Sequence, residues 1–125
     1  MATPEFIVSL RQKIGHDMLW LPGVSIVVVD EVGRLLLGRR ADNGRWAVVS
    51  GIPEPGEQPA VAIRRECLEE TGVDVEVLAI TSVTAGEPFA FPNGDNCVFM
   101  DINFVGRARP GTAARAHAAD DESTH

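Results

Sequence analysis

The chain has 125 residues, 45% hydrophobic and 23% charged, which indicates a single globular domain rather than a multidomain protein. The net charge of −7 argues against a general nucleic-acid binder, because such a protein presents a basic face to phosphates. The longest apolar run stops at Asp30, too short for a membrane span, and the N-terminus does not resemble a secretory signal. Two cysteines without paired spacing fit a reducing compartment. We therefore expect a cytoplasmic protein with no nucleic-acid or membrane partner.

Apolar residues at helical spacing predict a short amphipathic helix between Phe6 and Met18. Residues 24–40 then form two β-rich runs around a Gly-containing turn at 30–33, which predicts a hairpin. Residues 46–49 are a third apolar run. Residues 50–59 contain two glycines and three prolines, so we expect a loop there.

The second half of the chain predicts one helix and two strands. The helix should begin near Pro59, since proline is tolerated in a first turn, and end at Gly72. Residues 73–83 and 96–105 are rich in β-branched and apolar residues, with a Pro/Gly/Asn loop between them. The order predicts an α+β fold with a mixed sheet, in which residues 1–19 form a helix and 20–125 the main domain. The tail 106–125 is Ala-rich and polar, so we expect it to be weakly structured.

Charge is distributed unevenly. Residues 34–45 contain four arginines and one aspartate, whereas residues 51–76 contain seven acidic residues and two arginines. A basic segment followed by an acidic one would suit a phosphate ligand bridged by a cation. Two solvated surface elements would give the same pattern.

Three glutamates of the expected helix share one side. At 100° per residue Glu66, Glu69 and Glu70 fall within an arc of about 100°. The roughly opposite side is expected to pack on the core, and it carries Val61 and Leu68 together with Ala60 and Cys67. Like charges at this spacing destabilise a helix, and a hard divalent cation would reverse the penalty. The alternative is an exposed acidic face that is salt-bridged to Arg64 and Arg65.

The spacing of the whole segment resembles a known motif. Gly51, five residues, Glu57, seven residues and then residues 65–73, RECLEETGV, match the Nudix box, G-x5-E-x7-R-E-U-x-E-E-x-G-U with U apolar. All seven fixed residues agree, and chance coincidence has odds on the order of 10⁻⁹ per start position. The resemblance covers about residues 20–105.

The resemblance implies a mixed sheet between helices, and hydrolysis of a nucleoside diphosphate linked to another moiety with Mg²⁺ or Mn²⁺. It makes Glu66 and Glu70 the principal metal ligands, with Glu69 sharing the role or supporting it. Gly51 would offer its backbone carbonyl to the metal. Arg65 would hold Glu57 by an ion pair.

Residues outside the box supply further candidates. Phosphate contacts are expected from Arg39, Arg40 and Arg45, because guanidinium groups suit phosphate oxygens. Candidates for a general base are Glu87, Asp95 and residues 120–122. A base could stack on aromatic side chains, for which core packing is the alternative role: Trp20, Trp46, Phe89 and Phe91. His16 and His117 are expected to be surface residues.

The end of the chain departs from the family pattern. Relatives usually have another strand and a helix after an acidic stretch such as 120–124, whereas this sequence stops at His125. A shortened C-terminal strand and helix would expose an apolar sheet face, lower stability and impair activity. A partner subunit in a homodimer, or the N-terminal helix, could cover that face. The alternative that we expect is that the chain is a shortened form of a longer protein.

Three functions compete. The first is pyrophosphate hydrolysis on an ADP-ribose-like compound or a nucleoside triphosphate, by metal-activated water. The second is a catalytically silent Nudix-like domain that binds a nucleotide or a protein. The third, isomerase chemistry on an isoprenoid diphosphate, needs a catalytic cysteine, and Cys67 is expected to face the core.

Overall fold

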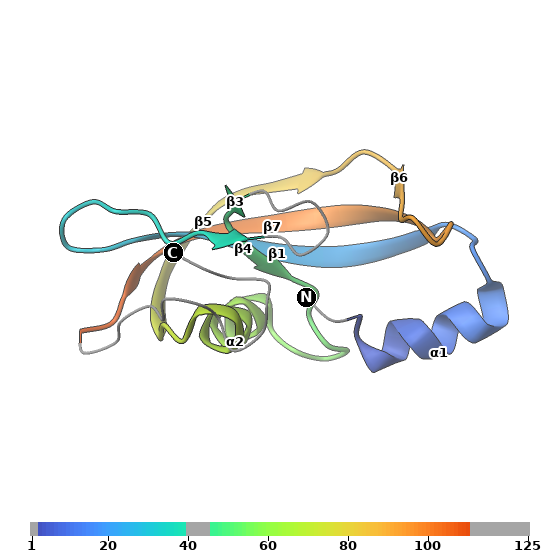
Figure 1. The fold of residues 1–125 in the computed structure, drawn as a ribbon, viewed down its shortest axis with the longest axis horizontal. Coiled ribbons are helices and arrows are strands. Elements are labelled where there is room, and N and C mark those ends of the chain that lie inside the picture. The colour runs from blue at the N-terminus through green and yellow to red at the C-terminus, as the bar shows by residue number, and fades with distance from the viewer. Residues whose placement is uncertain (1–2, 40–45, 111–125) are drawn as a thin grey trace.

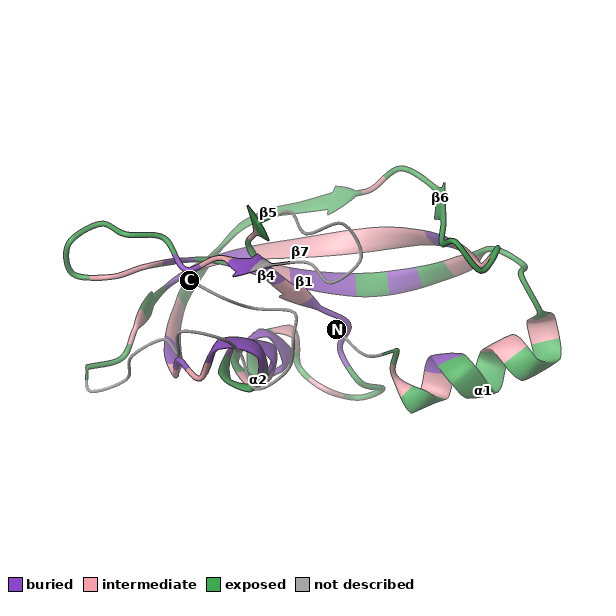
Figure 2. Cartoon of the chain, in the orientation of Figure 1, coloured by how far each residue is buried: buried purple, intermediate pink, exposed green. Residues whose placement is uncertain are grey.

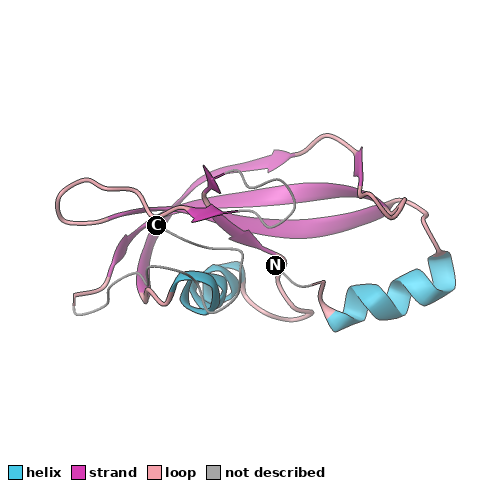
Figure 3. Cartoon of the chain, in the orientation of Figure 1, coloured by secondary structure: helices cyan, strands magenta, loops and turns pink. Residues whose placement is uncertain are grey.

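A computed structural model describes residues 3–39 and 46–110 and shows an α+β fold with a mixed sheet, as the sequence predicted (Figures 1 and 3). The helices are α1 (Glu5–Ile14) and α2 (Pro59–Thr71). The strands are β1 (Leu19–Val29), β2 (Gly38–Arg39), β3 (Trp46–Ala47), β4 (Val49–Gly51), β5 (Val75–Ala85), β6 (Phe89–Ala90) and β7 (Asn96–Ala108). No helix in the described ranges is long and apolar enough to cross a membrane.

The main sheet has five strands, in the order β4-β1-β7-β5 with β6 added to β7. β1 and β7 are parallel along their length, from Leu19 opposite Cys97 to Val29 opposite Arg107. β4 and β5 pair antiparallel at the two sides of this central pair. β4 brings Gly51 opposite Val24, which places the first residue of the box beside the centre of the sheet.

The larger core lies between α2 and one face of the sheet (Figure 2). Alternate residues of β1 point into it, since Val24, Ile26 and Val28 are all buried while Val27 is exposed. Ile63 and Cys67 of α2 are completely buried against this face. The core therefore fixes α2 on the sheet, and with it every residue of the box.

A second core joins α1 to the sheet. Its buried members are Ile7, Leu21, Ile52 and Cys97, and Phe99 packs against them. Leu21 belongs to the other alternate set of β1, so this core lies on the face of the sheet away from α2. Ile52 directly follows Gly51, so the loop after β4 contributes to both faces.

The N-terminal helix is shorter than predicted. α1 ends at Ile14 because Gly15 has a φ of +62°, and Met18 lies beyond it with an exposed side chain. The residue of α1 that is buried is Ile7 rather than Leu10.

The predicted hairpin forms only at its turn. Gly33 has a φ of +85°, and Asp30 accepts backbone N–H bonds from Val32 and Arg34, as a turn requires. Beyond the turn, Val29 and Leu35 form an isolated bridge and the N–H of Leu36 bonds to the carbonyl of Val28. Further along the chain, β2 pairs with β3 instead of β1. The expected loop 50–59 likewise begins later, since Ser50 and Gly51 belong to β4.

β5 is largely exposed. Its large apolar side chains Leu78, Ile80 and Val83 are each more than half accessible. The expectation of a weakly structured tail over residues 106–125 was wrong for residues 106–108, which are the end of β7. Residues 111–125 lie outside the described residues.

Candidate metal and pyrophosphate site

The site is built on α2, whose ends lie where the sequence predicted. Pro59 occupies the first turn, and Gly72 takes a left-handed φ of 77° while its N–H bonds to the carbonyl of Leu68. Thr71 extends the C-terminal end: its buried hydroxyl donates to the carbonyl of Cys67 and accepts from the N–H of Val73. These hydrogen bonds cap the C-terminal end of α2.

Arg65 of α2 forms an ion pair with Glu57 in the loop before the helix. Its Nε and Nη2 donate to the two carboxylate oxygens of Glu57, each at 2.8 Å, so the predicted ion pair is confirmed in bidentate form. Glu57 also accepts the N–H of Glu54 at 3.0 Å. Hydrogen bonds from Arg65 lower the pKa of Glu57 to about 2, so this carboxylate is ionised at neutral pH.

Glu66 lies directly against Gly51. A Cβ added to Gly51 would stand 2.5 Å from Cδ of Glu66 and 2.9 Å from its Oε2, too close for any side chain. The absence of a Cβ thus lets the carboxylate reach the backbone at the end of β4. Glycine is the residue that this contact allows.

Glu66 and Glu70 lie one turn apart on α2. Both are buried, with 7% exposure each. Burial raises the pKa of Glu66, while the adjacent Arg65 guanidinium, 3.0 Å from its Oε1, opposes the rise. Two ionised carboxylates one turn apart on a buried part of a helix repel each other, so a proton or a cation near them would stabilise the pair.

Glu69 does not join them. Its side chain is more than half exposed and its Oε2 lies 3.4 Å from Nη1 of Arg65. Within the described ranges, no three His, Cys, Asp or Glu side chains are arranged to hold a metal ion together. The predicted trio is therefore a buried pair, Glu66 and Glu70, with Glu69 turned to solvent.

The predicted core face of α2 was correct for Cys67 but wrong for Ala60, Val61 and Leu68. Val61 and Leu68 are exposed, and the buried face carries Ala62, Ile63, Cys67 and Thr71 together with Glu66 and Glu70. The prediction assumed that carboxylates avoid the buried side of a helix. Here two of them lie at its margin, where Arg65 and Gly51 accommodate them.

The donor set fits a hard divalent cation. An oxygen of the Glu66 carboxylate lies beside Gly51, Glu70 follows one turn later on α2, and Mg²⁺ and Mn²⁺ prefer oxygen ligands of this kind. The absence of a Cβ at Gly51 makes room for the side chain of Glu66.

Of the three arginines predicted to contact phosphate, the structure describes Arg39. Arg39 is in β2, where its backbone pairs with Trp46, and Trp46 is about half exposed. β3 rises on the side of the sheet opposite α2 (Figure 1). Arg40 and Arg45 lie outside the described residues.

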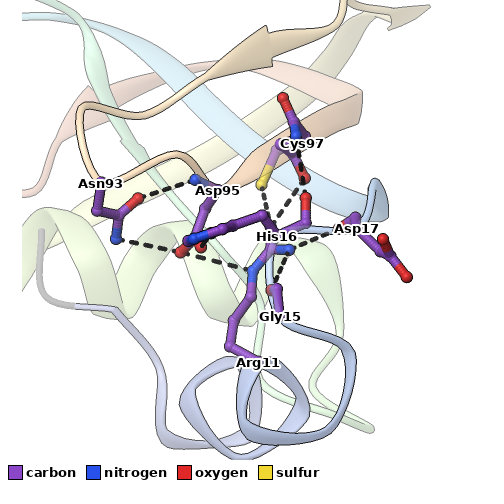
Figure 4. A network of polar contacts seen from close by, with 8 residues as sticks. Arg11, Gly15, His16, Asp17, Asn93, Asp95 and Cys97 are labelled. Atoms are coloured by element: carbon purple, nitrogen blue, oxygen red, sulfur yellow. Dashed lines mark hydrogen bonds and ion pairs between the residues drawn. The ribbon is translucent and has the colours of Figure 1, made fainter.

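Asp95 is engaged in a network that the sequence did not suggest (Figure 4). His16, expected to be an isolated surface residue, has its Nδ1 2.8 Å from Oδ1 of Asp95. Arg11 donates to the carbonyls of Asp17 and Asn96, and its Nε lies 3.5 Å from Oδ2 of Asp95. His16 and Asp95 are 79 residues apart in the chain and Arg11 and Asn96 are 85 apart, so no local pattern could reveal these two contacts. Residues 120–122 lie outside the described residues.

Cys67 has no exposed surface, and burial raises the pKa of its thiol to about 11. A thiol of this kind stays protonated at neutral pH and is a poor nucleophile. The expectation that Cys67 faces the core is confirmed.

The fold and box agree with comparisons to known proteins. The sequence model described as NUDIX domain matches residues 19–124, and the chain belongs to this family. The RNA pyrophosphohydrolase of Roseobacter denitrificans is 33% identical over 123 residues, covering 96% of this chain and 72% of that protein. A MutT-like protein of Streptomyces ambofaciens is 52% identical over 75 residues, 60% of this chain, but the chain matches only about half (49%) of its length.

Solved structures support the same fold. A MutT NUDIX hydrolase from Burkholderia pseudomallei superposes with a TM-score of 0.64 at 24% identity, covering 86% of this chain and 80% of that one. A UDP-X diphosphatase gives a TM-score of 0.65 at 18% identity, covering all of this chain and 58% of that one. Hydrolases of the NUDIX family generally use divalent metal ions.

Proposed function

We propose that the protein hydrolyses a pyrophosphate bond in a nucleoside diphosphate linked to another moiety, such as an ADP-ribose-like compound, or in a nucleoside triphosphate. The observation that carries this proposal is that Glu66 and Glu70, one turn apart on α2, are both buried, with Glu66 against Gly51. Two desolvated carboxylates so close on one helix are costly unless a positive charge lies near them. A divalent cation supplies that charge, and it also suits a diphosphate substrate.

Different residues of the candidate site would bind the metal, position the carboxylates and contact the substrate. Glu66 and Glu70 would hold Mg²⁺ or Mn²⁺, with the carbonyl of Gly51 beside them and Glu69 contributing from the solvent side. Arg65 fixes Glu57 and approaches Glu66, so it sets the position of both carboxylates. When bound, the cation neutralises phosphate charge and lowers the pKa of its bound water. Arg39, Arg40 and Arg45 would contact phosphates, and Trp46 would contact the substrate.

The test is turnover of Glu70→Gln on a panel of ADP-ribose and nucleoside triphosphates with Mg²⁺ or Mn²⁺. The substitution keeps the size of the side chain but removes its charge, and we expect a loss of at least about 10- to 100-fold. Glu76→Gln is the matched control, since Glu76 pairs with exposed Arg107 away from the site. Full activity of Glu70→Gln would contradict the metal assignment.

Two other outcomes are informative. Metal binding without turnover of any substrate would favour a silent nucleotide-binding or protein-interaction domain. Relatives named RNA pyrophosphohydrolase and NAD-capped RNA hydrolase make the 5′ end of an RNA the second candidate substrate. The net charge of −7 favours the small nucleotide, because a long polyanion would be repelled.

A further inference from the structure

One edge of the main sheet is long and exposed. This edge is β5, which has eleven residues, whereas the strand at the other edge, β4, has three. Among the described residues no strand pairs with β5 on the side away from β7. The backbone N–H and C=O groups of an edge strand are a template for pairing with another chain. Residues 78–85 are also exposed through their side chains (Figure 2).

The exposed part of β5 is apolar on the face of the sheet that carries α2. Ile80 lies opposite Phe104 in β7 and Val83 lies opposite Ile102, and both partners belong to the core beneath α2 or pack against it. α2 covers the start of β5, where Val75 is completely buried. Ile80 and Val83 lie further along the strand and are more than half exposed. The apolar face of the sheet therefore continues past α2 to this edge.

The edge also lacks charge. Residues 77–86, which we call the β5 edge, read VLAITSVTAG and contain neither a charged residue nor a proline. Edge strands are commonly protected from association by such residues. The register with β7 shifts at Leu78 and at Thr81, so the strand is bent there, but the bends add no charge.

The N-terminal helix does not cover the β5 edge. α1 packs with Leu21 and Phe99, which lie on the other face of the sheet. The charge of the chain then restricts which parts of two copies can meet, because each copy carries a net charge of −7. Two copies repel each other least where both surfaces are uncharged, and the β5 edge is such a surface.

The charged groups that flank the β5 edge suit an antiparallel pair of copies. At the start of the edge, Nε of Arg107 donates to Glu76 at 2.6 Å, and the Arg107 side chain is 65% exposed. A guanidinium group has five N–H donors, so the remaining nitrogens can bond to a second carboxylate. At the end of the edge, Glu87 is exposed. Antiparallel strands bring the start of one edge beside the end of the other, and so bring Arg107 of one copy near Glu87 of the second.

We propose that two copies of this chain associate through the β5 edge, with the two strands antiparallel about a two-fold axis near the middle of the strand. A two-fold axis makes an interface self-complementary, so each copy supplies the same surface. The contact buries Ile80 and Val83 of both copies and pairs Glu87 of each copy with Arg107 of the other. Since one strand from each copy gives a small interface, we expect a dissociation constant of about 1–100 µM.

The test is sedimentation equilibrium of the full chain between about 1 and 500 µM. We expect a monomer–dimer equilibrium, and we expect Ile80→Lys to weaken the dimer at least about tenfold because it places two like charges in the contact. Val61→Lys is the matched control. Val61 lies on the exposed side of α2 and is 58% exposed, as Ile80 is, and the substitution adds the same charge. Its dimer should be unchanged.

A chain that stays monomeric at about 500 µM, or that forms open-ended assemblies, would overturn the proposal. So would an Ile80→Lys variant that dimerises like wild type. If Ile80→Lys does not fold, Val83→Lys makes the same test. Glu87→Arg should weaken the dimer at least about threefold, and an unchanged affinity would refute the antiparallel arrangement. Mass is the readout, so a failed hydrolysis assay does not affect this result.

Discussion

Arg65 and Glu57 make the strongest ion pair of the site, and it gives stability a defined pH dependence. The pKa of Glu57 in the folded protein is about 2, below its ordinary value of 4.5. Its contribution is therefore complete above pH 4.5 and is lost as pH falls toward 2. We expect Glu57→Gln to lower the free energy of unfolding by about 1.5–3 kcal/mol at pH 7, with the difference shrinking below pH 4.5.

Urea unfolding of both proteins from pH 7 to pH 3 measures this difference. Glu76→Gln, which removes an exposed pair with Arg107, should cost less than about 1 kcal/mol. A constant gap between wild type and Glu57→Gln over the whole pH range would refute the assignment.

A substitution at Gly51 tests whether the metal site depends on the contact between Gly51 and the side chain of Glu66. In Gly51→Ala the new Cβ would overlap Glu66, so we expect Mn²⁺ affinity to fall at least about tenfold, by calorimetry. Gly33→Ala is the comparison: its φ of +85° predicts a loss of stability of about 1 kcal/mol or more, but its Cβ meets nothing and metal binding should persist. If Gly51→Ala binds Mn²⁺ as tightly as wild type, Glu66 does not need the glycine.

Sequence reasoning succeeded for residues close together in the chain. The pair of Arg65 and Glu57 was predicted because the motif fixes its spacing, whereas the link from His16 to Asp95 was missed because 79 residues separate them. The exposure of Glu69 was missed too, since three glutamates on one arc look equivalent until the neighbouring strand is placed. Burial distinguishes them, and burial is a tertiary property.

At the scale of elements, the buried hydroxyl of Thr71 caps the C-terminal end of α2. Thr71→Val removes the hydroxyl that accepts the buried N–H of Val73, leaving that donor without a partner. We expect a loss of about 1–3 kcal/mol in thermal or urea unfolding. Thr81→Val, whose hydroxyl donates to a carbonyl at an exposed position, should stay near wild type. Comparable losses of stability in both variants would mean that the buried hydroxyl of Thr71 contributes no more than the exposed hydroxyl of Thr81.

The bounds of α2 were predictable from Pro59 and Gly72, because proline and glycine act locally. Its buried face was not. Helical periodicity gives the relative angles of side chains, but which side meets the sheet depends on where β4 and Gly51 lie. The two-residue strand β6 was not predicted, since it lies in the segment expected to be a loop and is too short to show periodicity.

At the scale of the molecule, Arg11 ties α1 to the start of β7. Its guanidinium bonds to carbonyls of Gly15, Asp17 and Asn96 and lies beside Asp95. Arg11→Met should free α1, so we expect its backbone amides to exchange hydrogen at least about tenfold faster while those of α2 change little. Lys13→Met, on the exposed side of α1, serves as control. Unchanged protection of α1 in Arg11→Met would show that Ile7 and Phe6 suffice.

The parallel pairing of β1 with β7 has a consequence for how the protein is made. Each paired position joins residues 78 apart, for example Leu19 with Cys97, so a long loop must close before the sheet gains its centre. Chains dominated by such distant contacts fold slowly. During synthesis the ribosome must release nearly all of the chain up to Ala108 before β1 meets its central neighbour, and until then the apolar strand is exposed to chaperones and to other nascent chains.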